Sequence, residues 1–170
     1  MDTENKPNWY FRGEIDEHDF VRHRLPELGV PGHRNPDKDH DLTAPDLILD
    51  GMLADLKAQS TPFFTAEKYY GIPPQYAVSF NVKDEERYRE KYPHVVVVFD
   101  VLWTTTQATY GGVRYQVDPM HHTWCGTLDQ VMGVVADCGN HKHDYWRRKN
   151  DPNNAQDSWV LDVRKLLFLG

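Results

Sequence analysis

Apolar and polar residues alternate along the chain with a period that changes from helical to strand-like. Apolar residues at helical spacing, behind an acidic first turn, predict a helix over residues 12–28 that ends near Pro26. Prolines, glycines and a polar run predict a loop over residues 29–44. Beyond it, Asp50-Gly51 separates two apolar runs, and this pair favours a two-residue type I′ turn. The pattern therefore predicts a tight β-hairpin within residues 43–60.

The rest of the chain carries further strand and helix patterns. The near-continuous apolar run over residues 94–103 predicts a strand buried on both faces of a sheet. A spaced apolar stripe predicts a helix over residues 127–136. The other expected elements are a helix or loop over 63–71, a strand over 75–82, an exposed helix over 84–92, a hairpin or edge over 110–117, a loop over 150–158 and a strand or helix over 159–169. Residues 1–8 are polar and expected to be flexible. These elements predict one domain, residues 1–170, of the α/β or α+β class.

Length and charge narrow the possible classes of protein. A chain of 170 residues buries enough surface to fold without disulfides, and two cysteines are too few for a disulfide framework. The net charge of −7 argues against a protein that coats nucleic acid by bulk electrostatics, but acidic residues can also belong to an active site. The longest apolar run is too short to cross a membrane, and the first residues lack a signal-peptide pattern. We therefore expect a soluble, cytoplasmic protein with no membrane partner.

The predicted hairpin brings acidic residues together. If Asp50 and Gly51 form the turn, Asp46 lies opposite Asp55, and a period of two places Lys57 and Gln59 on the same face. The opposite face is apolar and consists of Leu47, Leu49, Met52, Ala54, Leu56 and Ala58. Two opposed carboxylates are destabilising unless a cation lies between them.

An exposed face on which Lys57 pairs with one carboxylate is the alternative interpretation of this hairpin. Ile48 and Leu53 share the face with the carboxylates, which favours a partly enclosed site.

These residues resemble a known motif. Pro45-Asp46 followed by Asp55-Leu56-Lys57 resembles the PD-(D/E)xK motif of the restriction-endonuclease-like nuclease superfamily. The upstream run RGxxxExDFV, from Arg12 to Val21, resembles the opening helix of the archaeal Holliday junction resolvases. That family usually has Glu where this chain has Asp55. The resemblance covers about residues 12–60, and the predicted helix and strand over 84–103 are compatible with its αββαβ order.

The resemblance implies a core of a central mixed sheet flanked by helices, over about residues 12–103, with residues 104–170 as an extension of the same domain. It also implies a DNA endonuclease that depends on Mg²⁺ or Mn²⁺ and hydrolyses phosphodiester bonds. Asp46, Asp55, the backbone carbonyl of Leu56 and Glu17 would hold the ion. Lys57 would orient or activate the attacking water, and Gln59 would help to position it. Glu14 is the alternative helical carboxylate, although an acidic residue in a first helical turn also serves the helix dipole.

A second group of residues has the spacing of zinc ligands. His122-x-x-Cys125 and Cys138-x-x-His141 flank the predicted helix over residues 127–136. They are expected either to hold a structural Zn²⁺ or to be small buried cysteines and loop histidines.

The most basic local run lies at residues 141–149. Its candidate DNA-binding residues are Lys142, Tyr145, Trp146, Arg147, Arg148 and Lys149. The cationic residues would contact phosphates while an aromatic ring stacks on a base. A solvated loop is the other interpretation.

The expected partners are DNA and, by analogy with many nucleases of the superfamily, a second copy of the chain. The sequence does not separate a junction resolvase from a restriction, homing, repair, phage or mobile-element nuclease. Two other classes stay open, a non-catalytic module whose carboxylates bind a structural cation or the basic surface of a partner, and a zinc protein.

Overall fold

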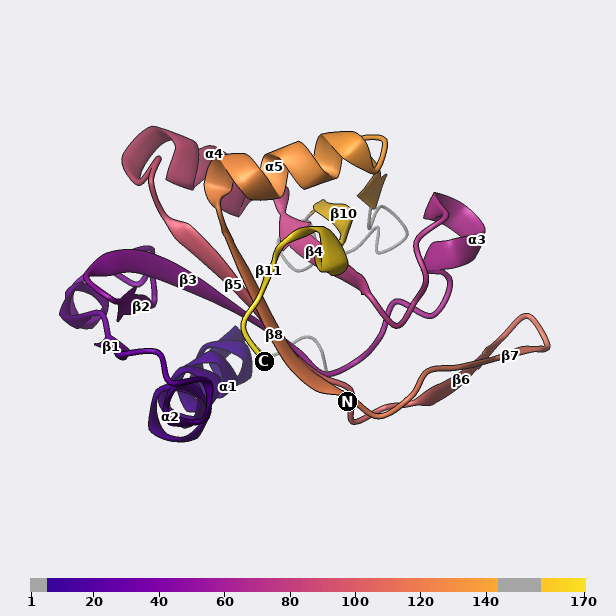
Figure 1. Ribbon diagram of the computed structural model, residues 1–170, viewed down its shortest axis with the longest axis horizontal. Helices are drawn as coiled ribbons and strands as arrows, with labels where there is room; N and C mark the ends of the chain where they lie inside the picture. The colour runs from indigo at the N-terminus through magenta and orange to yellow at the C-terminus, as the bar shows by residue number, and fades with distance from the viewer. Residues whose placement is uncertain (1–5, 144–156) are drawn as a thin grey trace.

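A computed structural model describes residues 6–143 and 157–170 of the chain. Its centre is a six-stranded mixed sheet in the order β1-β2-β3-β5-β8-β11, with helices on both faces (Figure 1). These strands are β1 (Gly32–Arg34), β2 (Leu47–Leu49), β3 (Met52–Gln59), β5 (Val96–Leu102), β8 (His121–Thr127) and β11 (Leu167–Phe168). The prediction of a mixed sheet flanked by helices is thus confirmed.

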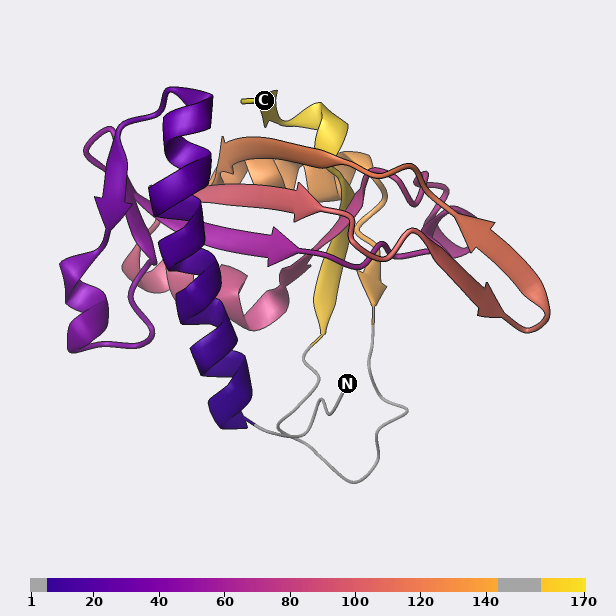
Figure 2. The ribbon, with the colours of Figure 1, turned by 90° about the horizontal axis from the view of Figure 1, so that it is seen from below.

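A long helical segment crosses one face of the sheet (Figure 2). It consists of α1 (Lys6–Asp19), a π-helical turn η1 (Phe20–Arg24) and α2 (Leu25–Leu28). The helix begins inside the stretch 1–8 that was expected to be flexible, so its predicted start at residue 12 is wrong. Its predicted end at residue 28, close to Pro26, is confirmed: Pro26 is tolerated in the first turn of α2, and the helix stops at Gly29, whose φ is 66°.

The predicted hairpin is confirmed in its turn and register. Asp50 and Gly51 have φ values of 46° and 79°, as a type I′ turn requires. Leu47 pairs with Ala54, and Leu49 pairs with Met52. The prediction of an uninterrupted loop over residues 29–44 is wrong, because β1 pairs antiparallel with β2. A three-residue strand next to Pro31 and Pro36 has too few positions to show a strand period.

The predicted buried strand lies in the middle of the sheet. β5 runs parallel to β3 on one side and antiparallel to β8 on the other, and its valines and phenylalanine are buried. The crossover from β3 to β5 contains α3 (Ala66–Tyr70), β4 (Ala77–Asn81) and α4 (Val82–Lys91). Strand β8 was not predicted, because the sequence HHTWCGT has little apolar alternation.

Helix α5 (Leu128–Asp137) and a smaller sheet cover the face of the large sheet opposite α1 (Figure 1). The helix begins with a capping box between Thr127 and Gln130, as its sequence favours. Beside it lies a three-stranded sheet of β4, β10 (Ser158–Asp162) and β9 (Lys142–His143). The hairpin of β6 (Gln107–Tyr110) and β7 (Val113–Gln116) projects from the body (Figure 1). Two short 3₁₀ turns, η2 (Pro36–Asp39) and η3 (Val163–Lys165), complete the described chain.

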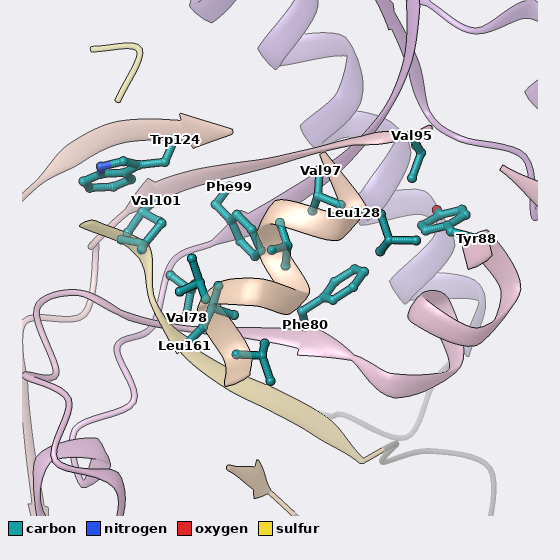
Figure 3. Packing of buried hydrophobic residues seen from close by; sticks show 14 of the residues in the cluster. Val78, Phe80, Tyr88, Val95, Val97, Phe99, Val101, Trp124, Leu128 and Leu161 are labelled. Atoms are coloured by element: carbon teal, nitrogen blue, oxygen red, sulfur yellow. The ribbon is translucent and has the colours of Figure 1, made fainter. Parts of the chain in front are cut away.

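The main apolar core fills the space between the large sheet and α5. Val97, Phe99 and Val101 of β5 point toward α5 and β4 (Figure 3). A second cluster packs Phe20 and Leu25 of the helical segment on the other face of the sheet. In the part of the chain that the structure describes, no helix has the length and apolar character needed to cross a membrane.

Candidate functional site

The two hairpin aspartates lie near the end of β2 that is away from the turn. Asp46 directly precedes β2, and its Oδ2 accepts a hydrogen bond of 2.9 Å from the backbone N–H of Leu56. Asp55 lies in β3, one residue before Leu56, and both aspartate side chains are buried. The negative charge of Asp46 contributes to raising the pKa of Asp55, as expected for two neighbouring carboxylates. The predicted proximity of Asp46 and Asp55 is therefore confirmed.

Pro45 explains why the ladder between β2 and β3 stops at this point. Continuing the observed register places Pro45 opposite Leu56, and proline has no N–H to donate to the Leu56 carbonyl. The carbonyl oxygen of Pro45 accepts instead from the side-chain amide of Asn35, at 2.8 Å. The Leu56 N–H, which then lacks its ladder acceptor, is the one bound by Asp46. Pro45 thus supplies no ladder donor to the Leu56 carbonyl, and the use of this carbonyl as a metal ligand stays a prediction.

Asp55 is buried beneath α4, where it contacts Tyr88 and Lys57. Its Oδ1 accepts a short hydrogen bond from the hydroxyl of Tyr88, and its Oδ2 lies 2.7 Å from Nζ of Lys57. That second contact is a close ion pair between two largely buried groups. Burial raises the pKa of Asp55 to about 6, against the opposing effect of the Lys57 charge. The same burial, together with the Asp55 charge, raises the pKa of Tyr88.

Lys57 bridges two carboxylates. Its Nζ is 2.7 Å from Asp55 and 2.6 Å from Oδ2 of Asp84, which is in the first turn of α4. Burial opposes the charged form of Lys57, but the two carboxylates outweigh this effect and raise the pKa of Lys57 well above its usual value. Burial likewise opposes ionisation of Asp84, yet Lys57 and Arg87 together lower the pKa of Asp84. The motif lysine is thus held as a cation between Asp55 and Asp84.

Glu17 joins this region through a second lysine. The side chain of Lys38, in the turn η2, places Nζ 2.5 Å from Oδ1 of Asp46 and 3.4 Å from Oε1 of Glu17. Arg34 contacts the other oxygen of Glu17, at 3.3 Å, and pairs with Asp39 at 2.6 Å. Glu17 is 7% exposed, whereas the alternative Glu14 is on the solvent side of the helix. The structure therefore brings Glu17, and not Glu14, to the hairpin carboxylates.

Gln59 is engaged elsewhere. Its amide nitrogen donates to the carbonyl of Ser79, at 3.0 Å, and its amide oxygen accepts from the backbone N–H of Ser79, at 3.4 Å. These two bonds tie β3 to β4. The structure thus shows Gln59 as a brace between the two sheets, although it was expected to help position the reacting water.

The cluster matches the chemistry of a hard cation only in part. Its donors are carboxylate oxygens and a strand carbonyl, which Mg²⁺ and Mn²⁺ prefer. The raised pKa of Asp55 indicates that Lys57, its cationic neighbour, only partly offsets the cost of burying the ionised carboxylate. The lysines and Arg34, however, already pair with these carboxylates, and among the described residues no group of three or more His, Cys, Asp or Glu side chains is arranged to hold a metal ion.

The raised pKa of Asp55 predicts a specific pH dependence of stability. The folded-state pKa, about 6, is above the unfolded value of ~3.9, so the folded protein binds this proton more tightly. The resulting stabilisation is complete below pH ~4 and is lost as pH rises through about 6. With a metal chelator present, the unfolding free energy of the wild-type protein should fall by about 3 kcal/mol across this window because of Asp55. The Asp55→Asn variant should not show this contribution. Urea unfolding of both proteins at several pH values measures it, and parallel profiles would contradict the assignment.

The residues expected to bind zinc are not brought together. On β8, His122 and Cys125 are three positions apart, so they point to opposite faces of the sheet. His122 contacts Trp124 and Phe168, whereas Cys125 packs against the cluster of Phe20 and Leu25. Cys138 packs on the other side, with the core beneath α5, and His141 lies against Tyr70. In a loop, two ligands separated by two residues can reach one metal ion, but on a strand this spacing turns the two side chains to opposite faces.

The predicted DNA-binding run falls mainly outside the described residues. Tyr145, Trp146, Arg147, Arg148 and Lys149 lie outside them, so the structure does not bear on these five. Lys142 is described, and its Nζ lies 5.3 Å from the ring centre of Trp159. This cation is exposed on β9.

Arg34, Lys38, Asp84 and Tyr88 contact the carboxylates of this site and were missed by sequence reasoning. Tyr88 and Asp84 are on α4 and are separated from their partners by 33 and 27 positions. Their presence on one side of α4 was a detectable signal, because positions four apart share a helix face. Lys38 carried no such signal, since it lies in a turn without a period.

Comparison of the chain with protein-family models, with curated proteins and with solved structures found no match in any of the three.

Proposed function

We propose that this protein is a divalent-cation-dependent DNA endonuclease that hydrolyses phosphodiester bonds. The observation that carries the proposal is the convergence of Asp46, Asp55 and Lys57 at one buried end of the hairpin. The order of helix, antiparallel strands, crossover and parallel strand contains the order that the resemblance to PD-(D/E)xK nucleases implies. Glu17, which the same resemblance assigns to the site, is linked to Asp46 through Lys38.

The residues of the site can divide the reaction between them. Asp46, Asp55, the Leu56 carbonyl and Glu17 would hold Mg²⁺ or Mn²⁺, which when bound supplies positive charge for the reacting phosphate. Lys57 is held as a cation next to Asp55 and would orient the attacking water. Tyr88 donates to Oδ1 of Asp55 and thereby fixes the carboxylate orientation. Asp84 keeps Lys57 charged and in place.

DNA and a second copy of the chain are the partners in this proposal. Two chains would supply two such sites, one for each strand of a duplex. The basic run over residues 141–149, which includes the exposed Lys142, would add phosphate contacts.

A non-catalytic binding module is the second candidate, and one observation favours it. Each carboxylate of the cluster already has a cationic neighbour or a hydrogen-bond donor. In such a module the network would hold α1, the hairpin and α4 together and would take no part in a reaction.

Cleavage assays separate the two candidates. The purified chain is incubated with linear duplex, single-stranded DNA, a flap and a four-way junction, each with Mg²⁺, with Mn²⁺ or with a chelator. We expect cleavage of at least one substrate with a divalent cation and none with the chelator. Absence of cleavage on all four substrates with both ions, in protein that remains folded, would favour the binding module.

A further inference from the structure

Lys38 occupies the position between two carboxylates of the site. Its Nζ lies 2.5 Å from Oδ1 of Asp46 and 3.4 Å from Oε1 of Glu17. All three side chains are largely buried, with 12% of the Lys38 side chain exposed. The remaining oxygens of the two carboxylates have other partners, the Leu56 N–H for Asp46 and Arg34 for Glu17. The ammonium group of Lys38 therefore contacts the one oxygen of each carboxylate that these partners do not bind.

The fold places Lys38 there by a specific local device. Asn35 is 2% exposed, and its side-chain oxygen caps the turn η2 by accepting from the N–H of Asp37. The same side chain donates to the Pro45 carbonyl, and the backbone N–H of Asn35 donates to the Asp46 carbonyl, both at 2.8 Å. The turn that carries Lys38 is thus fastened to the two residues that begin the motif. This attachment of the backbone positions the Lys38 side chain against Asp46.

We propose that the ammonium group of Lys38 is the resident cation of this carboxylate pair, and that a divalent cation must displace it from Asp46 in order to bind. Oδ1 of Asp46 cannot hold both, because a metal ion at the usual ~2.1 Å and an ammonium group on the same oxygen would be two cations in near contact. The negative charge of Asp46 and Glu17 is compensated by Lys38 before the exchange and by the metal ion after it. The inference rests on the cation binding in the proposed function, and it adds that Lys38 sets the affinity for the ion.

Lysine is suited to this exchange. Its single charge is at the end of a flexible stem, so the group can leave one oxygen without moving the backbone. Arg34, which contacts Oε2 of Glu17, would keep that carboxylate oriented while Lys38 moves. Lys38 is therefore a positioning residue, which acts through Asp46 and Glu17.

Calorimetric titration with Mn²⁺ tests the exchange without any measurement of cleavage. The full chain is compared with Lys38→Met, with Lys38→Gln and with the control Lys83→Met, which removes an exposed lysine of α4. Losing the competing cation should tighten Mn²⁺ binding by about fivefold or more in both Lys38 variants, with no change in the control. Without metal, the Lys38 variants should melt at lower temperature than the wild type, and Mn²⁺ should raise their melting temperature by more.

Three results of this titration are informative. Tighter binding together with the larger thermal response supports the exchange. Equal or weaker Mn²⁺ binding by folded Lys38→Gln overturns it and leaves the proposed nuclease function standing. Absence of Mn²⁺ binding in every protein, the wild type included, overturns both the exchange and the cation dependence of the proposed function.

Discussion

Asp55→Asn should reduce divalent-cation-dependent DNA cleavage by about a thousandfold or more, because it removes a charged ligand from the proposed site. The substitution keeps the size of the side chain, and its amide oxygen can still accept from Tyr88. Since the Asp55 carboxylate is buried and its pKa is raised to about 6, the neutral amide should not lower stability at pH 7.5. The loss of activity should therefore occur in a fully folded protein.

The matched control is Asp129→Asn, which removes an exposed carboxylate at the start of α5, away from the hairpin. Initial cleavage rates and thermal unfolding are measured for both variants on the substrate that the wild-type protein cuts best. We expect the control to retain the wild-type rate. An Asp55→Asn protein that cleaves at the wild-type rate with Mg²⁺ would remove Asp55 from the reaction.

Lys57→Met should lower the unfolding free energy by about 3 kcal/mol at pH 8, because it leaves buried Asp55 without its cationic partner and removes one of the two cationic partners of Asp84. The effect should be smaller at pH 5, where Asp55 is protonated in the folded protein and has no charge to compensate. Cleavage should also be lost. Urea unfolding at the two pH values measures the difference.

A double variant identifies the source of this instability. Lys57→Met combined with Asp55→Asn removes both charges of the pair and should recover the larger part of the lost stability at pH 8, while cleavage stays absent. If the double variant is as unstable as Lys57→Met alone, packing of the lysine stem, and not its charge, accounts for the effect.

Local signals carried most of the fold that could be predicted. The hairpin was predictable because Asp50-Gly51 favours its turn and the flanking alternation allows only one register. Helix α5 was predictable because its cap and its apolar stripe agree. Elements β1 and β8 were missed, since one is too short to show a period and the other has few apolar residues.

The sequence by itself determined that Asp46, Asp55 and Lys57 share one face of a hairpin, because a two-residue turn and a period of two leave no other arrangement. Only the tertiary structure decided what surrounds them. Lys38, Asp84 and Tyr88 reach the carboxylates through packing of η2 and α4 against the hairpin. It also decided that His122 and Cys125 diverge, because β8 pairs with β5 and becomes a strand. Contacts between distant segments depend on packing of the whole chain and leave no periodic trace in the sequence.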